Sequence, residues 1–211
     1  MDKDKEKLTA TPENENFTGK YENNGIIAQK LVNNYFKAVE ILFKKTNNVK
    51  NCHEIGSGEG LSSQKLNKLV PSLSASEFVD KFVEQAKNNN PQLKVFQESV
   101  YDLKYEDNSV DLIFLLEVLE HLDYPELALQ EISRVSKKYL ILGVPREPIW
   151  CFLNICRFKY LNRLGNTPGH LNNWSKKQII NLVEKEFGKV IAVESPLPWT
   201  ILLAEKNSEK L

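Results

Sequence analysis

Hydrophobic residues along this chain of 211 residues recur with two different spacings, which predict alternating helices and strands. Apolar positions three or four residues apart predict helices, whereas short and almost continuously apolar runs predict strands that are buried on both faces. The predicted helices cover residues 26–45, 61–70, 79–88, 125–135 and 175–187. The predicted strands cover residues 49–55, 73–78, 93–98, 110–116, 139–144, 189–195 and 199–204.

This order of elements predicts an α/β fold, a three-layer α/β/α sandwich around a seven-stranded and mostly parallel sheet. Only residues 196–198 connect the last two strands, which is too short for a crossover helix, so the last strand is expected to run antiparallel. Residues 1–16 are polar and are expected to be a disordered tail. Residues 17–211 are expected to form a single domain, in which residues 145–173 are one long insertion.

Composition argues against several classes of function. The chain has 28 basic and 28 acidic residues, so it lacks the positive excess expected of a protein that binds nucleic acid through bulk charge. Three cysteines form no disulfide framework and fit a cytoplasmic location. The three histidines lie far apart in the sequence, so no metal site is expected. No apolar run is long enough to predict a membrane span.

A glycine-rich turn follows the first predicted strand. Gly56, Gly58 and Gly60 stand at every second position, where residues without Cβ allow a sharp turn and the close approach of a ligand. In open α/β sheets, nucleotide-like ligands bind at such strand-to-helix turns. Glu77, at the end of the second predicted strand, is placed to accept the hydroxyls of a ribose, although a solvated glutamate is the alternative. Phe78 would then cover a purine face or belong to the core.

Residues 49–144 resemble the class I, seven-stranded, S-adenosylmethionine-dependent methyltransferases. The sequence EIGSGEG at residues 54–60 looks like the first motif of that family, which holds the methionine part of the cofactor. Residues 99–103 look like the segment beside the adenine, where the family often has Asp at the position of Ser99. Residues 107–113 and 117–122 look like the fourth strand and the turn that follows it.

The resemblance implies that S-adenosyl-L-methionine is the cofactor and S-adenosyl-L-homocysteine the product. By the same resemblance, the expected cofactor-binding residues are Glu54, Gly56, Ser57, Gly58, Gly60, Glu77, Phe78, Ser99, Val100, Tyr101 and Glu117. The sulfonium of this cofactor is already activated, so alignment of the acceptor behind the methyl group supplies much of the catalysis.

Two histidines are candidate catalytic residues. His121 follows the fourth predicted strand and could remove a proton from the acceptor, while a packing or helix-capping histidine is the favoured alternative. His170 lies in the insertion and either lines the acceptor pocket or has a plain loop role. Arg146 could contact an anionic acceptor, and an ion pair with a neighbouring loop is its alternative.

The insertion at residues 145–173 is rich in large apolar residues. It is interpreted either as an amphipathic helix packed on the core or as a lid over an apolar acceptor pocket that could touch a membrane surface. Trp150 and His170, together with Tyr21 from the N-terminal segment, are the expected acceptor contacts.

The predicted function is methyl transfer from S-adenosylmethionine to a small-molecule acceptor, by O- or N-methylation rather than C-methylation. An NAD(P)-dependent oxidoreductase is one alternative. The third glycine of its usual G-x-G-x-x-G turn would fall at position 61, which is Leu61 here. The Tyr-x-x-x-Lys pair of the short-chain type is also missing, since no tyrosine has Lys four residues later. A non-catalytic cofactor-binding subunit is the other alternative. The sequence predicts no oligomeric state.

Overall fold

The computed structural model of the protein describes residues 25–207, built around one seven-stranded sheet of order β3-β2-β1-β4-β5-β7-β6. The strands are β1 (Cys52–Ile55), β2 (Leu73–Glu77), β3 (Lys94–Gln97), β4 (Val110–Leu116), β5 (Ser136–Pro145), β6 (Gly188–Glu194) and β7 (Trp199–Lys206). The helices are α2 (Ile26–Phe43), α3 (Leu61–Leu66), α4 (Asp80–Asn89), α5 (Pro125–Val135), α6 (Ile149–Cys156) and α7 (Lys176–Glu186), with short 3-10 turns η2 (Leu119–His121) and η3 (Leu161–Arg163). The expected tail at residues 1–16 and the candidate Tyr21 lie outside the described residues.

The pairing of the strands confirms the predicted fold class. β1 pairs in parallel with β2 and β4, and β4 pairs in parallel with β5. β7 lies between β5 and β6 and runs antiparallel to both. The short connection between β6 and β7 therefore makes the two strands antiparallel, as its length predicts.

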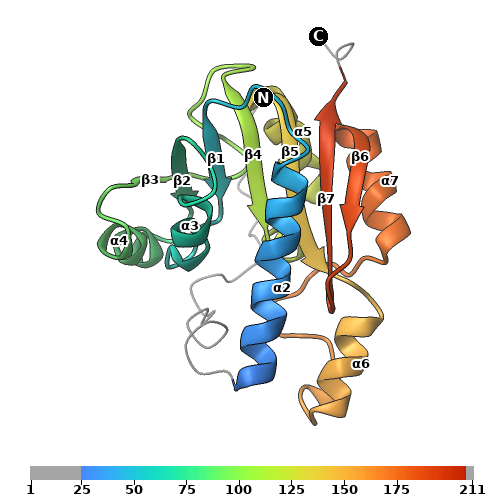
Figure 1. The fold of residues 1–211 in the computed structure, drawn as a ribbon. Helices are drawn as coiled ribbons and strands as arrows, with labels where there is room; N and C mark the ends of the chain where they lie inside the picture. The colour runs from blue at the N-terminus through green and yellow to red at the C-terminus, as the bar shows by residue number, and fades with distance from the viewer. Residues whose placement is uncertain (1–24, 208–211) are drawn as a thin grey trace, which may run out of the picture.

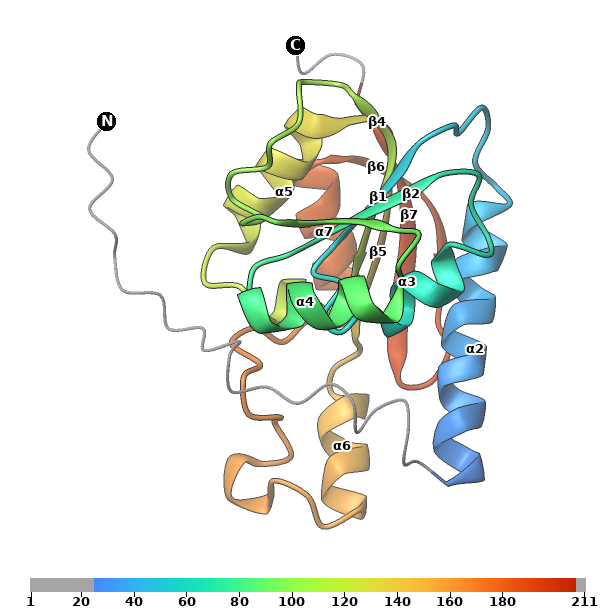
Figure 2. The ribbon, with the colours of Figure 1, turned by 90° about the vertical axis from the view of Figure 1, so that its left-hand side faces the viewer.

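Helices cover the two faces of the sheet (Figures 1 and 2). On one face, α2, α3 and α4 pack on a core that includes Leu42, Leu66 and Phe114. On the other face, α5 and α7 pack on a core that includes Leu129 and Val183. Because both faces are covered, the central strands are apolar almost throughout, as the sequence pattern indicated.

Several boundaries differ from the predictions by one to four residues; β1, for example, begins at Cys52 rather than residue 49. α3 ends at Leu66, four residues early, because its last turn tightens into 3-10-type bonds such as Leu69 N to Leu66 O (2.8 Å) before Pro71. β5 begins at Ser136 rather than residue 139, since Ser136 already pairs with Val110 of β4 directly after α5.

The carboxyl ends of the parallel strands and the start of the antiparallel β7 meet at one edge of the sheet. The insertion, with α6 and η3, lies beyond this edge, and the N-terminal end of α2 extends past it on the same side (Figures 1 and 2). Among the described residues, no helix is long and apolar enough to cross a membrane. Ligands of open α/β sheets bind outside the carboxyl ends of the strands, so this edge is where a site is expected.

Candidate functional site

The glycine turn joins β1 to α3 at this edge, and its three glycines adopt positive φ angles of 71°, 53° and 81°. A Cβ on Gly56 would lie 2.4 Å from Val118 Cγ2, and a Cβ on Gly60 would lie 2.4 Å from Asn90 Nδ2. These two glycines therefore allow the turn to pack closely on the segment after β4 and on α4. Ser57 in the same turn is buried, and its hydroxyl has no hydrogen-bond partner among residues 25–207. A buried hydroxyl of this kind fits a ligand that supplies the missing bond.

Glu77 ends β2, and its carboxylate is held against the glycine turn. Its Oε2 accepts a hydrogen bond from Gly58 N (2.9 Å), and its Oε1 accepts from Phe78 N (2.8 Å) and Val79 N (3.0 Å). A carboxylate has about four acceptor positions, so about one position remains for a further donor such as a ribose hydroxyl. The three amides orient the group before any ligand arrives.

Glu54, the acid of the first motif, points into the protein. Its side chain is only 1% exposed, and Ser63 Oγ of α3 donates a hydrogen bond to Oε2. Burial raises the pKa of this carboxyl above its ordinary value, while hydrogen bonds from Ser62 and Ser63 oppose the shift. In this structure Glu54 anchors the start of α3 behind the glycine turn.

Phe78 and the loop after β3 form the next part of the edge. Phe78 follows Glu77 directly and is 48% exposed, so its ring is available for stacking on an adenine. Val100 is buried in the core, whereas Ser99 and Tyr101 are partly exposed. Tyr101 N donates to Ser99 Oγ (3.3 Å), and the Tyr101 hydroxyl accepts from Tyr124 N (3.2 Å).

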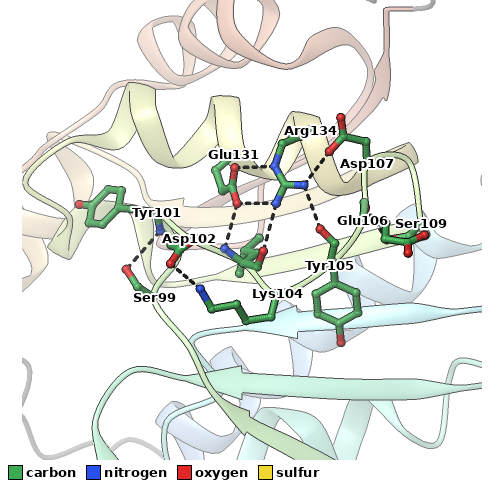
Figure 3. A network of polar contacts seen from close by, with 11 residues as sticks. Ser99, Tyr101, Asp102, Lys104, Tyr105, Glu106, Asp107, Ser109, Glu131 and Arg134 are labelled. Carbon is green, nitrogen blue, oxygen red and sulfur yellow. Dashed lines mark hydrogen bonds and ion pairs between the residues drawn. The ribbon is translucent and has the colours of Figure 1, made fainter. Parts of the chain in front are cut away.

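Arg134 of α5 fixes the chain that follows these residues (Figure 3). Its guanidinium donates two hydrogen bonds to the Glu131 carboxylate in a bidentate arrangement (2.7 and 2.8 Å) and forms an ion pair with Asp107 (2.6 Å). It also donates to the carbonyl oxygens of Leu103 (3.0 Å) and Tyr105 (2.9 Å). The hydrogen bond from Arg134 lowers the pKa of the Glu131 carboxyl. The loop that carries the candidate adenine contacts is therefore attached to a rigid helix.

Glu117 is the first residue after β4 and has a left-handed backbone, with φ of 59°. Its amide donates to Gly143 O (2.8 Å), and its carboxylate accepts a hydrogen bond from Trp199 Nε1. Such a backbone is uncommon for a residue other than glycine, and it is found frequently at functional sites.

A row of aromatic rings continues from Trp199 along the edge. Ring centroids are 5.0 Å apart for Tyr35 and Trp199, 5.9 Å for Trp199 and Trp150, and 5.8 Å for Trp150 and His170. His170 then meets His121 edge-to-face at 5.0 Å. The row joins α2, β7, α6, the end of the insertion and η2, which are distant in the sequence.

Arg146 lies at the end of β5 beside this row. Its amide donates to Pro198 O (2.9 Å), and its Nε is buried. Within the part of the chain that the structure describes, no acceptor for this Nε–H is found.

Sequence reasoning identified most residues of this edge separately, and the fold brings His121 and His170 together. Sequence reasoning missed Trp199. Its position at the start of the last strand, which enters the sheet at this edge, was a signal that could have indicated it. Sequence reasoning also missed Glu120, which lies with the two histidines in a cluster of possible metal ligands. Distance in the sequence had argued against any metal site.

Comparisons with known proteins agree with this geometry. Residues 53–141 match the family model of the methyltransferase domain. The comparison with curated protein sequences gave no match.

Solved structures with the same fold include a SAM-dependent methyltransferase from Aquifex aeolicus (19% identity, TM-score 0.64, covering 80% of this chain and 89% of that one). The PH0226 protein from Pyrococcus horikoshii OT3 is similar at 13% identity and a TM-score of 0.67, over 90% of this chain and 96% of that one. The magnesium protoporphyrin IX methyltransferase (ChlM) from Synechocystis PCC 6803, solved with bound SAH, is similar at 15% identity and a TM-score of 0.64, over 88% and 89% of the two chains.

The match spans β1 to β5 and therefore includes the glycine turn, Glu77 and Glu117. The oxidoreductase, one of the two alternatives from the sequence, is set aside by this match. Residues 53–141 therefore match a methyltransferase domain, the described chain has the fold of the class I methyltransferases, and S-adenosyl-L-methionine is the cofactor.

Proposed function

We propose that this enzyme methylates a small-molecule acceptor that binds beyond the carboxyl edge of the sheet, between the glycine turn and the insertion at residues 145–173. The aromatic row from Tyr35 to His121 is the observation that carries this proposal. It connects the insertion to the segment after β4, which itself packs on the glycine turn through Val118 and Gly56. An acceptor beside this row would lie next to the cofactor.

The cofactor supplies a methyl group on a positively charged sulfur. Glu77 would accept a ribose hydroxyl, because three backbone amides already direct its carboxylate. The Ser57 hydroxyl and the amides of the glycine turn would hold the amino-acid end, with Glu54 supporting the turn from behind. Phe78 would cover one face of the adenine, and residues 99–101 would border its edge.

The insertion would form one wall of the acceptor site. Trp150 is held in place by a hydrogen bond from its Nε1 to Thr167 Oγ1 (2.9 Å), and it stacks on His170. His121 and His170 are the candidates for contact with the reacting atom of the acceptor, which we expect to be an oxygen or a nitrogen. Arg146 would pair with an anionic group if the acceptor has one.

An apolar acceptor suits this wall. Several large apolar side chains of the insertion are exposed, among them Phe152 (63%), Phe158 (84%) and Leu164 (80%). Exposed apolar groups gathered in one segment are typical of binding surfaces. We therefore propose the insertion as the lid of the acceptor site.

The test is a cofactor-turnover screen against pools of small molecules, followed by variants with the acceptor that reacts. Replacing Trp150 or His170 by Ala is expected to lower kcat/KM by at least about tenfold, because each removes a wall of the site. The affinity for S-adenosylhomocysteine, measured by calorimetry, should stay the same.

Lys159→Ala is the matched control, since Lys159 is an exposed polar residue of the same insertion and belongs neither to the aromatic row nor to the exposed apolar groups. If the Trp150 and His170 variants turn over every acceptor at the rate of the unaltered enzyme, the insertion does not border the acceptor.

A further inference from the structure

Glu120, His121 and His170 each place one potential ligand atom close to those of the other two. One carboxylate oxygen and one ring nitrogen from each histidine all lie within 4.8 Å of one another. We propose that these three residues bind a divalent transition-metal ion, for which Zn²⁺ is the best match, and that this ion contacts an oxygen of the methyl acceptor.

Backbone hydrogen bonds hold the two halves of this cluster together. Leu171 N and Asn172 N, directly after His170, both donate to Glu120 O at 2.9 and 3.0 Å. The Asn172 side chain donates to Leu122 O (2.7 Å). The ligands on η2 and at the end of the insertion are therefore fixed relative to each other by main-chain contacts as well as by their rings.

The His121 ring is oriented for metal binding. Its Nδ1 lies 3.1 Å from Gly169 O, and because a carbonyl oxygen only accepts, Nδ1 carries the proton of the neutral ring. Nε2 then has the lone pair. Histidines that bind metals commonly donate their other ring N–H to a backbone carbonyl in this way.

Burial and distance also suit an ion. Glu120 is 1% exposed and His170 is 5% exposed, and a divalent cation would balance the charge of a carboxylate at such a depth. In the tetrahedral geometry of a zinc site, donor atoms bound at about 2.1 Å are about 3.4 Å apart. A pair at the 4.8 Å limit would thus need to close by about 1.4 Å when the ion binds.

The type of ligand selects the metal. Imidazole nitrogens favour zinc and other first-row transition metals, whereas Mg²⁺ and Ca²⁺ prefer oxygen ligands. Two histidines with one carboxylate form a ligand set found in catalytic zinc sites, where a further coordination position is open to water or substrate.

The position of the cluster gives the ion a role, and this part rests on the proposed function. Val118, in contact with Gly56, is two residues before Glu120, so the cluster lies beside the cofactor turn. A hydroxyl bound to the ion would lose its proton to water more readily, since a metal lowers the pKa of a bound oxygen. That oxygen would form the bond to the methyl carbon as the carbon–sulfur bond breaks, and the bonding electrons would stay on sulfur. The inferred acceptor class is therefore a compound with a hydroxyl group.

Metal binding is tested directly, without cofactor or acceptor. Tag-free, chelator-treated full-length protein is titrated with Co²⁺, followed by its visible absorption, and Zn²⁺ is then added as competitor. We expect about one Co²⁺ per chain, displaced by Zn²⁺. Glu120→Gln and His170→Ala should each weaken the affinity by at least about tenfold.

Glu126→Gln is the matched control, because Glu126 is an exposed acid in α5, six residues after Glu120. S-adenosylhomocysteine affinity and a thermal melt report whether each variant is folded. Absence of Co²⁺ binding, or equal binding by folded variants, would overturn the metal site and leave a plain Glu–His contact. A protein that binds Co²⁺ through these residues but methylates nothing would instead overturn the proposed function and leave the site standing.

Discussion

At the scale of single residues, the candidate cofactor site is organised by backbone amides before a ligand is bound. Glu77 is the clearest case, since the turn amide of Gly58 and the two amides after Glu77 itself all donate to its carboxylate. Such fixed groups lose little conformational entropy on binding. The sequence position of Glu77 predicted a contact with the ribose, and the structure shows how its carboxylate is held.

Glu77→Ala is expected to weaken the binding of S-adenosylmethionine by at least about tenfold, because the ribose loses its acceptor and the Gly58 amide loses its partner. Calorimetry gives the affinity. Glu84→Ala is the control, since Glu84 is an exposed acid on α4 that pairs only with Lys87 in the described structure. Unchanged affinity of the Glu77 variant would show that this carboxylate does not bind the ribose.

At the scale of elements, the glycine turn also joins two helices. Asn90, fully buried at the end of α4, donates to Gly60 O (3.0 Å) and Ala86 O (3.0 Å), and so ties the start of α3 to α4. Gly60 combines a positive φ with a contact that leaves no space for a side chain. The third glycine of the motif thus serves helix packing as much as ligand approach.

Gly60→Ala is therefore expected to destabilise the fold by about 2–4 kcal/mol, from the left-handed backbone and from overpacking against Asn90. Urea unfolding measures the change. Gly25→Ala is the matched control, because a Cβ at Gly25 would meet nothing within 4 Å, and its effect should stay within about 1 kcal/mol. Equal effects of the two substitutions would contradict the packing role of Gly60.

At the scale of the whole molecule, the sheet order β3-β2-β1-β4-β5-β7-β6 decides which loops become neighbours. It sets the glycine turn after β1 beside the segment after β4, and it brings the start of β7 to the same edge. The insertion and α2 extend beyond that edge (Figure 2). One rigid sheet thus collects the candidate cofactor and acceptor residues.

The stability of the whole domain should depend on pH through His53. This residue is fully buried between hydroxyls of Ser74, Ser76 and Tyr105, and burial lowers its pKa to about 3. The folded pKa lies below the unfolded value of about 6.5, so protons bind the unfolded state first as the pH falls. Stability is then lost from about pH 6.5 downward, with a slope of about 1.4 kcal/mol per pH unit from this group.

Urea unfolding of the protein and of His53→Gln between pH 6 and pH 4.5 measures this contribution. The slope of the unfolding free energy against pH should be smaller in the variant by about 1.4 kcal/mol per pH unit, which corresponds to one proton. The comparison uses this slope and not the absolute free energy. Identical slopes would mean that His53 binds a proton equally in both states.

The sequence by itself determined the elements, the antiparallel last strand and the cofactor motifs. Those features depend on residues near one another in the chain, on apolar spacing, glycine positions and connection length. Helix ends such as that of α3 were less predictable, because the tightening of a last turn depends on its packing. Only the tertiary structure decided that His121 meets Gly169, 48 positions away, and that Trp199 reaches Glu117 across 82 positions. Such contacts follow from how the strands pair and where the insertion turns back, and no local pattern records either.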